Sequence, residues 1–220
     1  VFAYPTGLNP QKGGVERITD IIAKILLKRG YTIFYLNWKR EQDNYEYPVP
    51  VIDLPSSNLE DPNNLEVYNR FLKENRIDVI INQHGLYEGT YFLSQVKVQN
   101  VKIISVLHSD PFGYYNHLFA DLMTLRDSSI KEKVKRVARF FLYRKVKKII
   151  HRSLVNHYTF IQEHPQYVCL LSESYKERLE EYCDLPDNYF ISIPNPNTYE
   201  NIEIIPHKEP ILLFVGRLDN

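Results

Sequence analysis

The sequence predicts an α/β protein built on a Rossmann-like, doubly wound parallel sheet with helices on both faces, a three-layer αβα arrangement. Short apolar runs alternate with segments of helical periodicity along the whole chain. The interior runs at residues 77–82 and 101–107 are almost continuously apolar, as strands buried on both faces are. Polar residues follow these strands directly, at the edge where open parallel sheets bind their ligands.

The first strand–helix unit occupies the N-terminal end of the chain. Residues 1–4 predict a short apolar strand, and the proline-containing residues 5–12 predict a loop. From Val15 onward, apolar residues recur at the spacing of one buried helix face. Gly30 ends this helix, because glycine is the residue that most often follows a helix C-terminus.

The elements that follow repeat this alternation. Residues 32–38 form an aromatic and β-branched run, and residues 49–54 form a shorter run flanked by prolines, so both predict strands. Pro62 suits the first position of a helix, where its missing N–H leaves no hydrogen bond unmade. Helices are then expected at residues 62–75, at 89–98, and at 115–163 with a break near 127–129.

The last elements predict one further strand–helix–strand unit. Residues 167–171 read as a buried strand, and Ser172 suits the N-cap of a charged helix that ends near Cys183. Residues 189–193 predict a final strand, which Pro194 ends.

A glycine pair, Gly13-Gly14, stands at the start of the first helix. Without Cβ atoms the pair lets a ligand approach the backbone, and the unpaired N–H groups with the positive end of the helix dipole favour phosphate. The pair is not a full G-x-G-x-x-G motif, so a tight turn that packs helix on sheet explains it equally well. Glu16 suits the helix dipole and Arg17 suits an ion pair with a neighbouring carboxylate, so we assign neither to a site.

Other candidate site residues come directly after predicted strands. His108 follows residues 101–107, and a histidine there projects a neutral imidazole into a cleft or serves a structural role. His84 and Tyr87 line an acceptor pocket or belong to a polar loop. Asp110 is a further acceptor candidate, or it sets a turn beside Pro111. We expect the remaining histidines at the surface or in helix packing, since they share no ligand spacing: His117, His151, His157 and His164.

The composition excludes several classes of protein. No run of about 18 apolar residues is present to span a bilayer, and no signal peptide is visible. Cys169 and Cys183 lack the spacing of zinc ligands, so no metal is expected, and two isolated cysteines suit a reducing cytoplasm. No nucleic-acid partner is expected either, because the aromatic residues are spread over the chain and no binding module stands out.

The formal net charge is zero, but residues 131–152 carry ten Lys and Arg against one acidic residue, Glu132. One interpretation is the solvated side of a core helix whose packing face is formed by apolar residues. These residues are Ile130, Val134, Val137, Phe141, Val146, Ile149 and Ile150. The other interpretation is a surface drawn to anionic lipid headgroups or to a phosphate-bearing acceptor. Its cations would be Lys131, Lys133, Lys135, Arg136, Arg139, Arg144 and Lys145.

The end of the chain predicts a domain boundary. Residues 196–210 are rich in proline and polar residues, and they predict an interdomain linker after a first domain at residues 1–195. Residues 211–220 predict the first strand and turn of a second, truncated domain. We therefore expect the chain to be part of a longer protein.

Four segments occur in an order that resembles a known pattern. They are Gly-Gly-Val-Glu-Arg at 13–17, Ser-Val-Leu-His-Ser-Asp at 105–110, Cys-Leu-Leu-Ser-Glu-Ser at 169–174, and Ile-Pro-Asn-Pro at 193–196 with Phe-Val-Gly-Arg-Leu at 214–218. Together they resemble the N-terminal, acceptor-side half of a family 4 glycosyltransferase with the GT-B fold, in which two Rossmann-like domains face each other across the active site. The chain departs from the pattern at Pro196, where glycine is usual, and in lacking an aspartate shortly afterwards.

The resemblance implies retaining transfer of a sugar from a nucleoside-diphosphate sugar, which is a substrate and not a cofactor. It implies that His108 is the catalytic residue at the transferred sugar, and that Gly13, Gly14 and Arg217 contact the donor diphosphate. In the family, the remaining donor residues lie in the second domain.

We expect the parent protein to be a hexosyltransferase acting on a growing glycan or a lipid-linked acceptor, in the cytoplasm or peripherally at the inner face of the membrane. This chain alone is expected to be inactive, because the cleft needs both halves. Two alternatives stay open. One is a nucleotide-sugar epimerase of the same fold, and the other is a non-catalytic module whose basic helix docks on an anionic membrane or partner.

Overall fold

The computed structural model describes residues 1–39, 44–85, 88–113, 115–118, 129–164, 166–182 and 190–196. Its centre is a seven-stranded sheet in the order β3-β2-β1-β4-β5-β6-β7, in which every neighbouring pair is parallel. The strands are β1 (Phe2–Tyr4), β2 (Tyr35–Asn37), β3 (Val51–Asp53), β4 (Val79–Asn82), β5 (Lys102–Leu107), β6 (Gln166–Leu170) and β7 (Phe190–Ser192). The predicted Rossmann-like, doubly wound sheet is confirmed.

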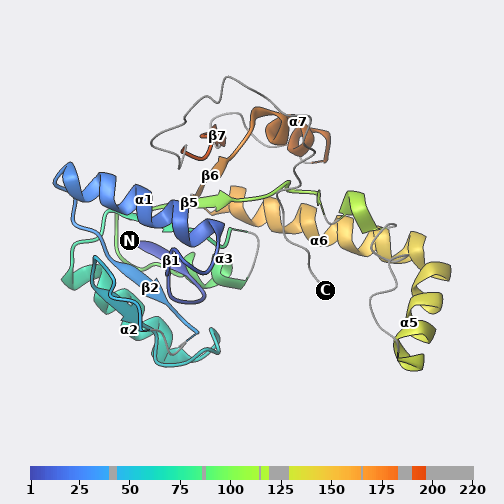
Figure 1. Cartoon of the computed structure of the whole chain (residues 1–220), viewed down its shortest axis with the longest axis horizontal. Helices are drawn as coiled ribbons and strands as arrows, with labels where there is room; N and C mark the ends of the chain where they lie inside the picture. The colour runs from blue at the N-terminus through green and yellow to red at the C-terminus, as the bar shows by residue number, and fades with distance from the viewer. Residues whose placement is uncertain are drawn as a thin grey trace, which may run out of the picture.

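Helices cover both faces of this sheet (Figure 1). They are α1 (Gly14–Lys28), α2 (Pro62–Glu74), α3 (Glu88–Leu93), α5 (Ile130–Phe141), α6 (Tyr143–Glu163) and α7 (Glu173–Tyr182). Successive residues of β1 point to opposite faces. Ala3 packs with Tyr68 of α2 in one core cluster, while Phe2 packs with Ala23 of α1 in another. The three-layer arrangement follows from this alternation.

A third core cluster surrounds the other half of the sheet. Tyr158 and Ile161 of α6 and Leu179 of α7 pack there with Val168 and Leu170 of β6. The side chains of α6 that enter this cluster come from its second half. Its first half carries the predicted basic segment.

Helix boundaries follow local chemistry that the sequence displays. At the end of α1, Gly30 has a φ of +87°, a conformation that favours glycine. Its N–H donates to Leu27 O, and the N–H of Tyr31 donates to Leu26 O, which together form a Schellman motif. At the start of α2, the Asp61 side chain accepts from the N–H of Asn63 and Pro62 follows the cap.

Two helical predictions need correction. The helix expected at residues 89–98 ends at Leu93, where the Ser94 hydroxyl donates to Thr90 O and the Gln95 N–H closes a tighter turn onto Phe92 O. The long helix expected at 115–163 contains a break at Leu142 that was not predicted, and the ψ of this residue is 4°. The linker expected at 196–210, apart from its first residue, and the strand expected at 211–220 lie outside the described residues. Most of the break expected near 127–129 lies outside them as well.

Candidate active site

The sheet order places a binding crevice at β1 and β4. Chain connections run from β1 outward through β2 to β3, and from β4 outward in the opposite direction. Ligands of such sheets bind beyond the carboxyl ends of the strands at this switch point. A pocket of about 240 Å³ lies there. It is lined by Tyr4, Val15, Gln83, His84, Gly85, Val106, Leu107, His108 and Ser109.

His108 enters this pocket directly after β5. Its Nε2 lies 2.6 Å from Gln83 Oε1, an amide oxygen that accepts hydrogen bonds. Nε2 therefore carries the proton of a neutral ring, and Nδ1 carries the lone pair. Burial lowers the pKa of His108, because the charged ring would lose hydration, so the neutral form is favoured at pH 7. The predicted catalytic histidine is thus an oriented, uncharged hydrogen-bonding group.

Gln83 is a site residue that the sequence prediction missed. Its side chain is 4% exposed and comes one residue after β4, beside the end of β5. Its position in the sequence could have identified it, because residues directly after the strands of such a sheet lie at the edge where ligands bind. At this strand end the sequence prediction names His84 and not the residue before it.

His84 lies in the pocket against two aromatic rings. The ring of Tyr4 meets it edge-on at 5.9 Å between centroids, and the ring of Trp38 lies at 6.3 Å. Burial lowers the pKa of His84 to about 4, and the positive charge of Lys39 adds to this effect. His84 is therefore uncharged at neutral pH. Tyr87, its expected companion, lies outside the described residues.

The turn that carries His84 is fixed from two sides through Gly85. The Gly85 carbonyl accepts from Thr90 Oγ1 and from His157 Nε2, each at 3.0 Å. A Cβ at Gly85 would lie 2.8 Å from the Val106 carbonyl oxygen, so a larger residue requires the backbone to shift. The other ring nitrogen of His157 lies 3.1 Å from the Tyr91 hydroxyl. His157 lies in helix packing, as expected, and it also supports the pocket wall, which was not expected.

The glycine pair at the start of α1 serves two different purposes. Gly13 is the N-cap, in extended conformation, and it makes no side-chain cap hydrogen bond. A Cβ there would overlap with Oε2 of Glu16, so Gly13 leaves room for that buried carboxylate. A Cβ at Gly14 would meet nothing within 4 Å, and the next residue, Val15, lines the pocket. The backbone at Gly14 is therefore open beside the pocket.

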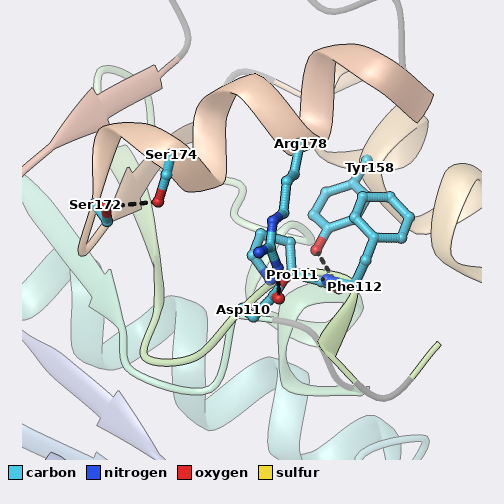
Figure 2. Close-up of polar contacts among 7 residues, drawn as sticks. All are labelled: Asp110, Pro111, Phe112, Tyr158, Ser172, Ser174 and Arg178. Atoms are coloured by element: carbon cyan, nitrogen blue, oxygen red, sulfur yellow. Dashed lines mark hydrogen bonds and ion pairs between the residues drawn. The ribbon is translucent and has the colours of Figure 1, made fainter. Parts of the chain in front are cut away.

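Asp110 has contacts that match the turn interpretation (Figure 2). Its Oδ1 accepts from the N–H of Phe112 at 3.0 Å, and its Oδ2 forms an ion pair with Arg178 of α7. Beside it, the Tyr158 hydroxyl of α6 donates to Pro111 O at 3.2 Å. Asp110 thus joins the end of β5 to α7, and Pro111 joins it to α6. Asp110 does not line the pocket. A role in acceptor binding stays a prediction.

None of the other predicted site residues whose side chains the structure describes lines the pocket. Arg217 lies outside the described residues. Lys131, Lys133 and Lys135 are exposed on α5, which also contains Arg136 and Arg139, and Arg144 and Lys145 are exposed at the start of α6. Within the described ranges, no three potential metal ligands cluster, and no helix has the length and apolarity to cross a bilayer. Cys169 is a buried free thiol.

Comparisons with known proteins show the family to which the chain belongs. A family model described as Glycosyltransferase Family 4 matches residues 12–196. Among solved structures, the chain matches WaaG, described as a glycosyltransferase involved in lipopolysaccharide biosynthesis, at 15% identity and a TM-score of 0.47. That match covers 90% of this chain and 45% of WaaG, so the chain spans less than half the length of that protein. No curated protein matches the chain. Because the family match extends over most of its length, the chain belongs to Glycosyltransferase Family 4.

Proposed function

We propose that the protein transfers a hexose, with retention of configuration, from a nucleoside-diphosphate sugar to a glycan or lipid-linked acceptor. The observation that carries this proposal is the composition of the pocket at the switch point. The backbone at the start of α1 is open beside the pocket, and His108 enters the pocket as a neutral, oriented ring. The chain belongs to Glycosyltransferase Family 4. The buried free thiol of Cys169 is consistent with a cytoplasmic reaction.

The residues of the pocket have complementary tasks in this reaction. The N–H groups in the first turn of α1, at Gly14, favour the donor diphosphate through hydrogen bonds and the helix dipole. The Nδ1 lone pair of His108 accepts a hydrogen bond from a hydroxyl of the transferred sugar, which orients the sugar. The bond between sugar C1 and the diphosphate breaks, and C1 bonds to the acceptor oxygen. The acceptor proton leaves with the diphosphate.

The donor requires contacts that this half of the molecule does not supply. The pocket is small relative to a nucleotide-sugar, at about 240 Å³. We propose that a second domain, with Arg217 in its first turn, encloses the diphosphate from the other side. Residues 1–220 alone are then inactive, because catalysis needs both walls of the cleft.

Product analysis with the full-length protein tests this proposal. A panel of nucleoside-diphosphate sugars is supplied with and without glycan and lipid-linked acceptors, and the release of nucleoside diphosphate and the anomeric configuration of the product are measured. We expect acceptor-dependent release and a product with the configuration of the donor. A new nucleotide-sugar formed without acceptor would instead identify an epimerase. No turnover of any donor would favour a non-catalytic module.

A further inference from the structure

Helix α5 exposes a continuous apolar stripe. Ile130, Val134, Val137 and Phe141 stand at the i, i+4, i+7 and i+11 positions, which fall on one side of a helix. These four side chains are 81%, 63%, 58% and 80% exposed. The expectation that they form a packing face is therefore wrong for the described structure. A shallow groove of about 390 Å³ runs along the stripe, with Lys133 at its border.

The position of α5 explains why the stripe is uncovered. Figure 1 shows α5 projecting beyond the first half of α6, away from β1 and β2. Of the described elements, α6 is the one against which α5 packs substantially. The bend at Leu142 turns α5 out of the line of α6, and Leu142 itself is half-exposed.

Positive charge surrounds this apolar stripe. Ten Lys and Arg occur within residues 131–152 against a single acidic residue. Among the described residues, no ion pair neutralises Lys131, Lys133, Arg144 or Lys145. A helix with an apolar stripe flanked by unpaired cations suits the interface of an anionic bilayer. There the acyl chains contact the stripe, and the headgroup phosphates form ion pairs with the cations.

We infer that α5 and the first half of α6 dock on an anionic phospholipid surface, with the stripe of α5 inserted at the level of the headgroups. Charge complementarity selects this occupant. A protein partner covering the stripe would bury neighbouring cations and would need matching carboxylates for each. A nucleic acid would leave the apolar stripe in water.

The docking surface lies on the pocket side of the sheet. The ring of Tyr115, seven residues after His108, lies 5.5 Å from the ring of His151 of α6 in a tilted arrangement. The ammonium of Lys147 lies 4.7 Å above the centre of the Tyr115 ring. The chain segment that leaves the pocket edge thus rests on the basic half of α6. If the proposed function holds, an acceptor with a lipid anchor is held close to the pocket. The docking itself does not depend on that function.

Vesicle co-sedimentation of the full-length protein tests this inference. Vesicles of phosphatidylcholine alone are compared with vesicles that also contain phosphatidylglycerol, at about 50 and about 500 mM salt. We expect binding to the anionic vesicles, weakened at the higher salt concentration, and little binding to the neutral ones. Phe141→Glu and Val137→Glu are each expected to lower binding by roughly ten-fold or more. Lys145→Glu is expected to lower it by about five-fold or more.

Two matched control variants test whether binding depends on this surface or on any exposed apolar or cationic residue. Tyr31→Glu changes an exposed aromatic residue near the end of α1, and Lys97→Glu reverses an exposed cation after α3; both should leave binding unchanged. Circular dichroism and thermal unfolding verify that each variant is folded. Absence of binding to anionic vesicles, or equal binding by the α5 variants and the controls, would overturn the inference. The inference would also be overturned if the protein did not bind vesicles but formed a concentration-dependent dimer that Val137→Glu dissociates. A second copy would then cover the stripe.

Discussion

Gly14 differs from Gly13 in what surrounds its missing side chain, and the difference yields a diagnostic substitution. Gly14→Ala meets no atom within 4 Å, so the free energy of unfolding should stay the same or rise by about 0.5 kcal/mol through helix propensity. If the donor diphosphate approaches this backbone, the added methyl group should raise the KM for donor by roughly ten-fold. Steady-state kinetics and thermal unfolding measure both effects. An unchanged KM for donor would place the diphosphate elsewhere.

Gln83 acts on the reaction through His108, as a positioning residue. Gln83→Glu places a carboxylate 2.6 Å from Nε2, and a nearby negative charge raises the pKa of a histidine. The acidic limb of the pH–rate profile should therefore move to higher pH. Gln83→Leu should lower kcat by about ten-fold with a smaller change in KM, because the ring loses its orienting acceptor. A pH–rate profile that Gln83→Glu leaves in place would contradict this role.

At the level of secondary-structure elements, a buried polar network ties the centre of the sheet to α3. Asn82 of β4 donates to Thr90 of α3 and to Ser105 of β5, and Ser105 donates to Gln166 of β6. All four side chains are at most 1% exposed. Thr90 in turn donates to Gly85 O, so the network also holds the pocket turn.

Breaking this network should destabilise the fold. Asn82→Leu removes the donor to the buried hydroxyls of Thr90 and Ser105 and the acceptor of the His84 N–H, which costs about 1–3 kcal/mol in the free energy of unfolding. Asn116→Ala, at an exposed position, should change it by less than about 0.5 kcal/mol. Urea unfolding of both variants provides the comparison. Equal stabilities would show that the network adds nothing.

The sequence predicted the elements better than it predicted the contacts between them. Apolar periodicity and turn residues such as Gly30 depend on neighbours a few residues away, so all seven strands and the start of α1 were expected. Gln83 and His157 reach the pocket only through pairings across 25 and 72 residues, which no local pattern contains.

The α5 stripe shows a different limit of sequence reasoning. The spacing of Ile130, Val134, Val137 and Phe141 is the same whether protein or lipid covers it, so periodicity alone predicted a packing face. Their exposed fractions show that the chain itself does not cover the stripe. For Asp110 likewise, position suggested a site, and the contacts with Phe112 and Arg178 describe a turn.

At the scale of the whole molecule, the buried His157 and the partly buried His84 and His108 make stability depend on pH. Burial lowers the pKa values of His84, His108 and His157 below their ordinary value of 6.5, that of His84 to about 4. The unfolded chain therefore binds more protons than the folded chain below about pH 6.5. The free energy of unfolding should fall as the pH drops from about 7.5 to about 5, before most carboxylates titrate.

Urea unfolding across this pH range measures the effect. His157→Gln keeps a hydrogen-bonding side chain for Gly85 but cannot titrate, so its stability should depend less on pH than that of the wild type. The surface variant His117→Gln should keep the wild-type dependence. A stability that does not fall toward pH 5 would contradict the burial of neutral rings.

The central claim is that His108, held by Gln83 at the switch point of the sheet, takes part in sugar transfer. The most direct test is the rate of acceptor-dependent nucleoside-diphosphate release by the full-length protein and its His108→Ala variant, with His117→Ala as the matched control. We predict that His108→Ala lowers kcat by roughly 100-fold or more at an unchanged melting temperature, while His117→Ala retains full activity. Full activity in a folded His108→Ala variant would contradict the claim and would remove His108 from the reaction.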